Sequence, residues 1–305
     1  MPIKNDKKII VILGPTASGK TKLAVELAEK FNGEIVSADS RQVYRGMDIG
    51  TGKDLAEYSV PYHLIDVVNP KLRFDLAQYQ KLAFAAIDDI LGRGKLPILA
   101  GGSGLYLQAV IDNYKLSDAK KDLALRKKLE KLNAGELFKK LEKLSPNLAV
   151  KLNQSDKNNK RRLIRYLEIL EQDKNFKSRK GQKKYEALLI GLSYSGEILK
   201  QRIFKRLMDR LKEQNMIGEV ENLRAKGLSW KRLEEFGLEY KFISLYLQSK
   251  LQYEEMVEKL NLAIFQFAKR QLTWFKRWEK QGANINWVKD NKKIEKLVKD
   301  YLEKR

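Results

Sequence analysis

GPTASGKT, residues Gly14 to Thr21, matches the pattern G-x-x-x-x-G-K-[ST] of a phosphate-binding loop. In such a loop the backbone N–H groups surround a diphosphate, the lysine neutralises its charge, and the final hydroxyl reaches a magnesium ion. Residues 7–13 form an apolar run typical of a buried strand, and residues 21–31 repeat apolar side chains at helical spacing. The order of strand, glycine loop and helix is the one the motif requires. The stretch therefore predicts a ligand that carries phosphates, and it leaves the identity of that ligand open.

Short apolar runs alternate with helical segments over the first 114 residues. Strands are expected at residues 9–13, 34–39, 63–68 and 96–102, and a helix is expected at residues 76–91. This alternation is typical of an α/β fold with a parallel sheet, and it defines residues 1–114 as the first part of a P-loop core.

The chain changes character after residue 114. Residues 115–183 are rich in lysine and helical in pattern, which predicts an inserted all-helical subdomain with a break at 145–160 and a mobile basic loop at 175–184. Residues 184–305 are expected to complete the core with one further strand at 185–193 and C-terminal helices, including a long amphipathic helix at 254–278.

The composition narrows the possible classes of protein. Of the 305 residues 43% are hydrophobic, which is enough for a sizeable core. The chain has no cysteine and a single histidine, His63, so disulfides, a thiolate nucleophile and a zinc site are not expected. The longest aliphatic run is too short to span a bilayer, and the N-terminus lacks the apolar core of a secretion signal. We therefore expect a cytoplasmic monomer that does not enter a membrane.

The positive charge is concentrated in the second part of the chain. The formal net charge is +22, yet residues 1–114 hold 14 Lys/Arg against 13 Asp/Glu, while residues 115–305 hold 47 against 26. Such an asymmetry indicates a polyanionic partner such as a nucleic acid. The alternative is a set of solvated lysine-rich helix faces, which describes stretches such as residues 127–144 (KKLEKLNAGELFKKLEKL) well.

Polar and glycine residues follow two of the predicted strands. Asp39, Ser40, Arg41 and Gln42 come after the second strand, and Gly101 to Gly104, with Ser103 among them, come after the fourth. Ligands of open α/β sheets bind beyond the carboxyl ends of the strands, so both segments are candidates for the same site as the phosphate loop. P-loop NTPases place an aspartate at the end of a hydrophobic strand to hold magnesium, and ILAGG (98–102) has none. This absence argues against an ATPase.

Six segments of the chain together resemble the tRNA dimethylallyltransferases, also called tRNA isopentenyltransferases, in their bacterial form. They are GPTASGKT (14–21), SADSRQVYRGMDIGTGK (37–53), PYHLID (61–66), RGKLPILAGGSGLY (93–106), RRLIRYLE (161–168) and AKRQLTWF (268–275). The segment FGLEYK (236–241) departs from the glycine-tyrosine pair that is usual in this family. The resemblance implies a fold related to nucleotide kinases. It also implies that the dimethylallyl group of dimethylallyl diphosphate is transferred to N6 of adenosine 37, beside the tRNA anticodon.

The resemblance assigns the diphosphate to the phosphate loop, with Mg²⁺ on the Thr21 hydroxyl. The implied diphosphate-binding residues are Gly14, Pro15, Thr16, Ala17, Ser18, Gly19, Lys20 and Thr21. Backbone donors of Thr16 to Thr21 would stabilise the charge that develops as the C–O bond breaks. Arg202 and Arg206 lie four apart on a predicted helix and are expected to join them; the alternative is two solvated helix charges.

The resemblance assigns the acceptor chemistry to Asp39 and Ser103. Asp39 matches the proposed general base, which an exocyclic amine needs because its lone pair is delocalised into the ring. Ser103 keeps the hydroxyl of a position that is commonly threonine in the family. The residues implied to contact the tRNA anticodon stem-loop are Asp39, Ser40, Arg41, Gln42, Ser103, Arg126, Arg161, Arg162, Leu163, Ile164 and Arg165.

Three other functions share some of these features. A P-loop kinase that binds ATP and phosphorylates a small metabolite would have the same sheet and loop, but it would not need the basic second half. A prenyltransferase acting on free adenine nucleotides would need no inserted RNA-binding subdomain. A noncatalytic RNA-binding protein would have no use for Lys20, Thr21 and Asp39.

Overall fold

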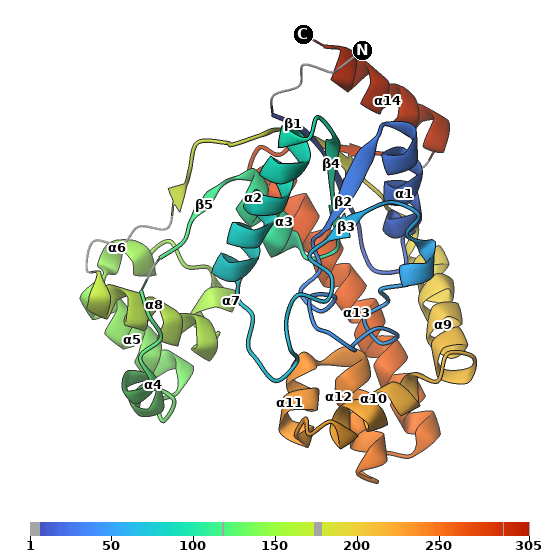
Figure 1. Ribbon diagram of the computed structural model, residues 1–305. Helices are drawn as coiled ribbons and strands as arrows, with labels where there is room; N and C mark the ends of the chain where they lie inside the picture. The colour runs from blue at the N-terminus through green and yellow to red at the C-terminus, as the bar shows by residue number, and fades with distance from the viewer. Residues whose placement is uncertain (1–6, 118, 174–178, 289, 305) are drawn as a thin grey trace. The chain divides into compact units, whose positions relative to one another are not determined.

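The computed structural model describes residues 7–117, 119–173, 179–288 and 290–304 (Figure 1). The chain forms two compact units. Residues 1–112 and 183–305 make up the first, which we call the core unit, and residues 113–182 make up the second, which we call the inserted unit.

The core unit is built on a six-stranded parallel sheet with the strand order β3-β2-β4-β1-β7-β8. The strands are β1 (Lys8–Leu13), β2 (Gly33–Ser37), β3 (Tyr62–His63), β4 (Leu96–Gly101), β7 (Glu186–Gly191) and β8 (Ile285–Trp287). The predicted parallel α/β fold is confirmed. The chain leaves β1 toward β2 on one side of the sheet and leaves β4 toward β7 on the other. Its direction therefore reverses between the neighbouring strands β1 and β4, which is where such sheets open a crevice.

Helices cover both faces of this sheet. The side chains of β1 alternate, so that Ile9 and Val11 pack in one cluster with α2, α3 and α13, while Ile10 and Ile12 pack in another with α1 and α14. These helices are α1 (Lys20–Lys30), α2 (Leu76–Gly92), α3 (Gly104–Ile111), α13 (Tyr253–Lys280) and α14 (Asn291–Glu303). The result is a three-layer sandwich with β1 fully buried at its centre.

A second helical cluster stands beyond the carboxyl end of the sheet (Figure 1). It comprises α9 (Gly196–Lys212), α10 (Met216–Ala225), α11 (Trp230–Phe236), α12 (Leu238–Leu247) and the first half of α13. Its core includes Val43, Tyr44 and Met47 from the segment after β2. Helices and sheet are therefore joined at the edge where the phosphate loop lies.

The inserted unit has a small core of its own. It contains β5 (Tyr114–Lys115), α4 (Leu123–Leu129), α5 (Ala134–Leu144), α6 (Pro146–Ala149), α7 (Gln154–Lys157), α8 (Lys160–Gln172) and β6 (Arg179–Lys180), with β5 and β6 paired antiparallel. Leucines of α5 and α8, such as Leu137 and Leu163, are completely buried. The break expected at residues 145–160 contains the one-turn helices α6 and α7. Residues 175–178 of the expected basic loop lie outside the described residues.

Three details differ from the expected strands. The inserted subdomain was expected to be all-helical, but it also contains the short antiparallel pair β5–β6, which forms only because two segments distant in sequence meet. The strand expected at residues 63–68 ends at His63, because Leu64 and Asp66 adopt positive φ angles of 64° and 56° that a strand cannot continue through. The edge strand β8 was not expected at all. No helix in the described part of the chain is long and apolar enough to cross a membrane.

Candidate active site

A cavity of about 880 Å³ opens in the core unit beyond the carboxyl ends of β1, β2 and β4. Its lining comes from four loop segments, which are the phosphate loop, residues 39–42, residues 50–58 and the turn at 100–103, and from the facing sides of the three helices α9, α12 and α13. The two strand-end segments singled out in the sequence thus share one cavity with the phosphate loop.

The phosphate loop begins at Gly14, directly after the last residue of β1. A side chain at Gly14 would bring a Cβ to 2.6 Å from the Leu192 carbonyl oxygen, so the loop passes the end of β7 only as glycine. Gly19 caps α1 with a left-handed φ of 83°, a conformation that glycine adopts without strain. The first N–H groups of α1 have no acceptor within the helix, and they carry its positive dipole end. The loop is therefore built to bind an anion.

Lys20 is held back against its own loop. Its Nζ donates to the Pro15 carbonyl at 2.6 Å. Burial, together with the positive charge of Arg206, lowers the pKa of Lys20 to about 7, and Asp39 opposes this shift. A bound diphosphate would supply the negative charge that this lysine lacks in the free protein.

Three arginines of α9, spaced four residues apart, line the cavity. Arg202 Nε donates to the Ala17 carbonyl at 2.7 Å, and Arg206 donates to the Thr16 hydroxyl. Arg210, only 4% exposed, pairs with Asp54 at 3.3 Å. Burial, then the charge of Arg210, lowers the pKa of Arg206 to about 10. Arg202 and Arg206 were predicted from the sequence. Arg210 was not predicted, although Arg210 continues the same spacing.

Asp39 is fixed at the end of β2 by its own turn. Its Oδ1 accepts from the N–H groups of Arg41 at 2.8 Å and Gln42 at 3.4 Å. The neighbouring Ser40 N–H donates to Ser103 Oγ at 3.0 Å, and the Ser103 N–H donates to the Ala38 carbonyl. Ser103 is therefore bonded to the backbone of the two residues that flank Asp39, which holds the candidate hydroxyl beside the candidate base at one side of the cavity.

Arg41 and Gln42 are both engaged within the protein. Arg41 Nε donates to the Phe236 carbonyl at 2.9 Å. Gln42 accepts from Ser37 Oγ at 3.0 Å and donates to the Gly52 carbonyl at 2.9 Å. These contacts hold the segment after Asp39 against the helical cluster and the Gly52 loop.

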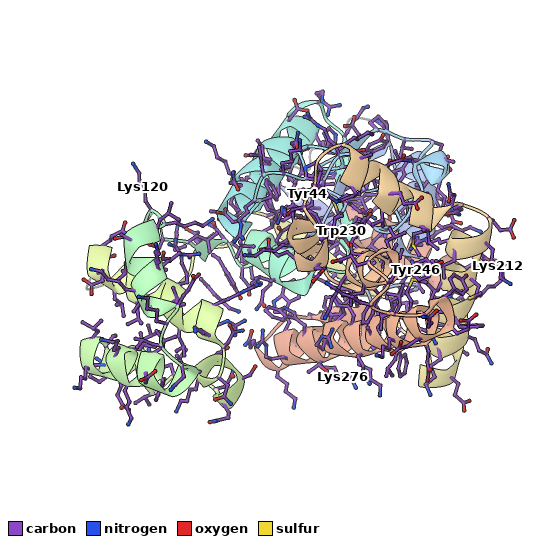
Figure 2. All side chains as sticks on the ribbon, turned by 90° about the horizontal axis from the view of Figure 1, so that it is seen from below. Tyr44, Lys120, Lys212, Trp230, Tyr246 and Lys276 are labelled. Carbon is purple, nitrogen blue, oxygen red and sulfur yellow. The ribbon has the colours of Figure 1, made fainter. Side chains whose placement is uncertain are left out.

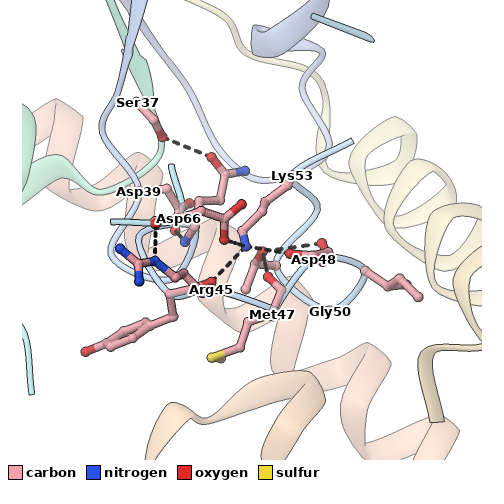
Figure 3. A network of polar contacts seen from close by, with 12 residues as sticks. Ser37, Asp39, Arg45, Met47, Asp48, Gly50, Lys53 and Asp66 are labelled. Atoms are coloured by element: carbon pink, nitrogen blue, oxygen red, sulfur yellow. Dashed lines mark hydrogen bonds and ion pairs between the residues drawn. The ribbon is translucent and has the colours of Figure 1, made fainter. Parts of the chain in front are cut away.

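The buried side chain of Lys53 holds the segment after β2 together through polar contacts within the protein (Figure 3). Its side chain is completely buried, and its Nζ donates to the Tyr44 carbonyl at 2.7 Å and pairs with Asp48 and Asp66. From outside, Glu219 accepts from the backbone N–H groups of residues 48, 49 and 50. The wall of the cavity at residues 50–52 is therefore rigidly supported.

The cavity is also lined by an acid, Glu239, that was not predicted from the sequence. Glu239 lies in the first turn of α12, within the segment FGLEYK that departs from the family pattern, and it lines the cavity. Burial raises the pKa of its carboxyl group, while Arg210 and Arg206 act in the opposite direction. The sequence did contain an indication of Glu239, because FGLEYK has this acid where the family usually has the glycine of a glycine-tyrosine pair.

The candidate RNA-binding residues of the inserted unit fall into three groups according to their surroundings: arginines paired with acids, one exposed arginine, and two buried aliphatic residues. Arg126 and Arg165 both pair with Glu168, whose side chain is completely buried, and Arg162 pairs with Asp156. Arg161 is exposed and pairs with no acid among the described residues. Leu163 and Ile164, which are also predicted to contact the tRNA, have side chains that are buried in the unit's core.

Basic side chains extend outward from both units. Figure 2 shows the exposed side chains of Lys120 in the inserted unit and of Lys212 and Lys276 in the core unit pointing away from the ribbon. The inserted unit holds 20 Lys/Arg against 9 Asp/Glu, which is half of the chain's net charge of +22 in less than a quarter of its length.

Comparison with known proteins decides the family. Residues 42–278 match the family model described as IPP transferase. The chain belongs to the tRNA dimethylallyltransferase, or IPP transferase, family. It is 48% identical over 286 residues to tRNA dimethylallyltransferase 2 of Citrifermentans bemidjiense, covering 93% of this chain and 91% of that one. It is 46% identical over 289 residues to tRNA dimethylallyltransferase 1 of Syntrophus aciditrophicus, covering 92% and 93%.

Solved structures of the IPP transferase family have the same fold. The tRNA isopentenylpyrophosphate transferase of Bacillus halodurans matches with a TM-score of 0.71 and 37% identity over 97% of both chains. A eukaryotic dimethylallyltransferase described as acting on tRNA matches with a TM-score of 0.78 and 30% identity, over 93% of this chain and 74% of that one.

Proposed function

We propose that this enzyme transfers the dimethylallyl group of dimethylallyl diphosphate to N6 of adenosine 37 of tRNA and releases diphosphate. The observation that carries the proposal is a single cavity lined by a phosphate loop, by the cations Lys20 and Arg206, and by the carboxylate of Asp39. Family membership favours this reaction over the kinase and over a noncatalytic RNA-binding protein.

In the proposed reaction the amine nitrogen N6 attacks C1 of the prenyl group as the C1–O bond breaks. The electron pair of that bond leaves with the diphosphate, where the N–H groups of α1, Lys20 and the α9 arginines meet the growing charge. Asp39 accepts the proton that N6 loses, so that the product amine is neutral. The target base has to leave the anticodon-loop stack to enter the cavity.

The residues present fit a magnesium ion that relies on its substrate for ligands. Among the described residues no cluster of three or more His, Cys, Asp or Glu side chains could hold a metal. The Thr21 hydroxyl would hold the ion beside the loop, and phosphate oxygens and water would supply its other ligands, as is usual for Mg²⁺. When bound, Mg²⁺ would neutralise part of the diphosphate charge.

We assign the positioning of tRNA to the basic inserted unit and to the segment after β2. The exposed Arg161 is the clearest candidate for a phosphate contact, whereas Arg126 and Arg165 support the unit through the buried Glu168. Ser40 and Ser103, which are bonded to each other beside Asp39, are placed to meet the target nucleotide.

The test compares two donors. Labelled dimethylallyl diphosphate with unmodified tRNA is incubated with the protein and Mg²⁺, beside labelled ATP with a panel of metabolites. Prenyl transfer to tRNA that is lost when adenosine 37 is replaced by guanosine supports the proposal. Phosphoryl transfer from ATP without prenyl transfer would support the kinase instead. Transfer to free AMP but not to tRNA would support the nucleotide prenyltransferase.

A further inference from the structure

Gln271 of α13 joins two segments of the active site that are far apart in sequence. The side chain is only 6% exposed. Its Oε1 accepts from the Thr16 N–H at 2.8 Å, and its Nε2 donates to the Gly102 carbonyl at 2.8 Å. A carboxamide can accept from one backbone group and donate to another, so both ends of Gln271 are used at once.

The space at Gly102 is shaped by this amide. A Cβ added to Gly102 would lie 2.3 Å from Gln271 Nε2, and its other neighbours are farther than 3.3 Å. The backbone of Gly102 does not adopt a positive φ. The glycine at this position therefore makes room for Gln271, and it serves no unusual backbone conformation.

The two joined segments belong to the two halves of the proposed reaction. Thr16 is part of the diphosphate loop, and its hydroxyl also receives a hydrogen bond from Arg206. Gly102 precedes Ser103, whose Oγ accepts from the N–H of Ser40, the neighbour of Asp39. A shift of Gln271 would thus change the separation between the leaving group and the base.

We propose that Gln271 is a positioning residue that sets the distance between the bound prenyl diphosphate and the acceptor adenosine. The proposal rests on the proposed function above. Gln271 acts through Thr16 and Gly102 and need not touch either substrate. Because Thr16 donates its N–H to Gln271, the diphosphate is bound by the remaining donors of the loop and by the first turn of α1.

The test replaces Gln271 by methionine, which keeps the length of the side chain and removes both hydrogen bonds. The rate is measured in a single turnover with tRNA and dimethylallyl diphosphate both saturating, and the two dissociation constants are measured separately. We expect the rate to fall about 10- to 100-fold, because a displacement of about 1 Å costs that much in positioned reactions. Both dissociation constants should stay within about threefold of the wild type, since no direct ligand is removed.

Gly102→Ala provides an independent route to the same displacement. Its rate should fall similarly, and the Gly102→Ala, Gln271→Met protein should be no slower than the slower single variant, because both changes break one link. Gly92→Ala is the matched control, because a Cβ at that position in α2 meets nothing within 4 Å. It should transfer at the wild-type rate.

The outcomes separate this proposal from the proposed function. A wild-type protein that transfers no prenyl group would refute both. If the wild type is active and Gln271→Met transfers at the same saturated rate, the proposal alone is refuted. It is also refuted if the loss follows the melting temperature and the rate per folded molecule is normal, because Gln271 would then serve only the stability of the fold.

Discussion

Binding of diphosphate should draw a proton onto Lys20. In the free protein, burial and the charge of Arg206 lower the pKa of Lys20 to about 7, so at pH 8 only about one molecule in ten carries the ammonium charge. A diphosphate in the loop favours the charged form. The terminal phosphate of an alkyl diphosphate such as dimethylallyl diphosphate loses its last proton near pH 6, so at pH 8 this ligand is fully ionised whether free or bound. Binding at pH 8 should therefore take up about 0.9 proton per site.

The same coupling makes the affinity depend on pH. If only the ammonium form of Lys20 binds well, the apparent dissociation constant scales with the inverse of the charged fraction. For a pKa of about 7 this predicts binding about 50-fold weaker at pH 9 than at pH 7, or about 2.3 kcal/mol. The sign is fixed by the direction of the shift, because raising the pH through a lowered lysine pKa removes the charge that attracts the ligand.

Titration calorimetry with dimethylallyl diphosphate and Mg²⁺ in the absence of tRNA, in two buffers of different ionisation enthalpy, measures the proton uptake directly. Lys20→Met should bind without appreciable uptake and with little dependence on pH between 7 and 9. Lys30→Met, at the other end of α1 and exposed, should behave as the wild type. Equal proton uptake by Lys20→Met and the wild type would refute the assignment of the titrating group.

Four further substitutions test other parts of the structure. Asp39→Asn should lower the single-turnover transfer rate by roughly 10²- to 10⁴-fold while tRNA affinity is nearly unchanged; a rate close to wild type would exclude Asp39 as the base. Arg161→Gln should reduce the slope of log tRNA affinity against log salt by about 0.7 to 0.9 at unchanged melting temperature, whereas Arg165→Gln should lower the melting temperature because it weakens the pairing of Glu168. An unchanged salt slope in Arg161→Gln would remove that phosphate contact. Glu34→Gln should cost about 2 kcal/mol of folding stability at pH 7 and leave the transfer rate alone, as denaturant melts and the same assay would show.

Glu34→Gln should affect stability and not the transfer rate, because Glu34 lies at the opposite end of the sheet from the active site. Glu34 in β2 is nearly fully buried and is bonded to Arg93, Lys95 and His63. These bonds, foremost those from Arg93, hold the pKa of its carboxyl group well below its usual range. A lowered pKa contributes stability above the unfolded value of about 4.3, and that contribution is lost as the pH falls below it. The stability difference between wild type and Glu34→Gln should therefore shrink in acid.

Local signals in the sequence predicted the catalytic half of the site. The phosphate loop is defined by eight consecutive residues, and Asp39 and Ser103 follow strands whose carboxyl ends must meet in a parallel sheet. Arg202 and Arg206 were predicted from the family resemblance together with their helical spacing. Arg210 continues that spacing by one more turn and could have been included.

The features that were missed depend on contacts between distant segments. Gln271 and Thr16 are 255 positions apart, and nothing in RQLTWF indicates which backbone groups its amide will meet. β8 has three residues and exists because it pairs with β7, so it carries no length signal of its own. The end of β3 was misplaced because the positive φ of Leu64 has no counterpart in residue type.

The division of the molecule into two units makes two readouts independent. The titratable cation of the diphosphate site, Lys20, belongs to the core unit, whereas half of the chain's net charge belongs to the inserted unit. Changes of pH between 7 and 9 should therefore act on diphosphate binding, and changes of salt should act chiefly on tRNA binding through released counterions. Gln271 joins the phosphate loop to the segment beside Ser103 within the core unit, so its replacement should change neither the diphosphate affinity nor the tRNA affinity. A defect that appears only in the saturated rate, at any pH or salt, is thus the signature that distinguishes positioning from binding in this enzyme.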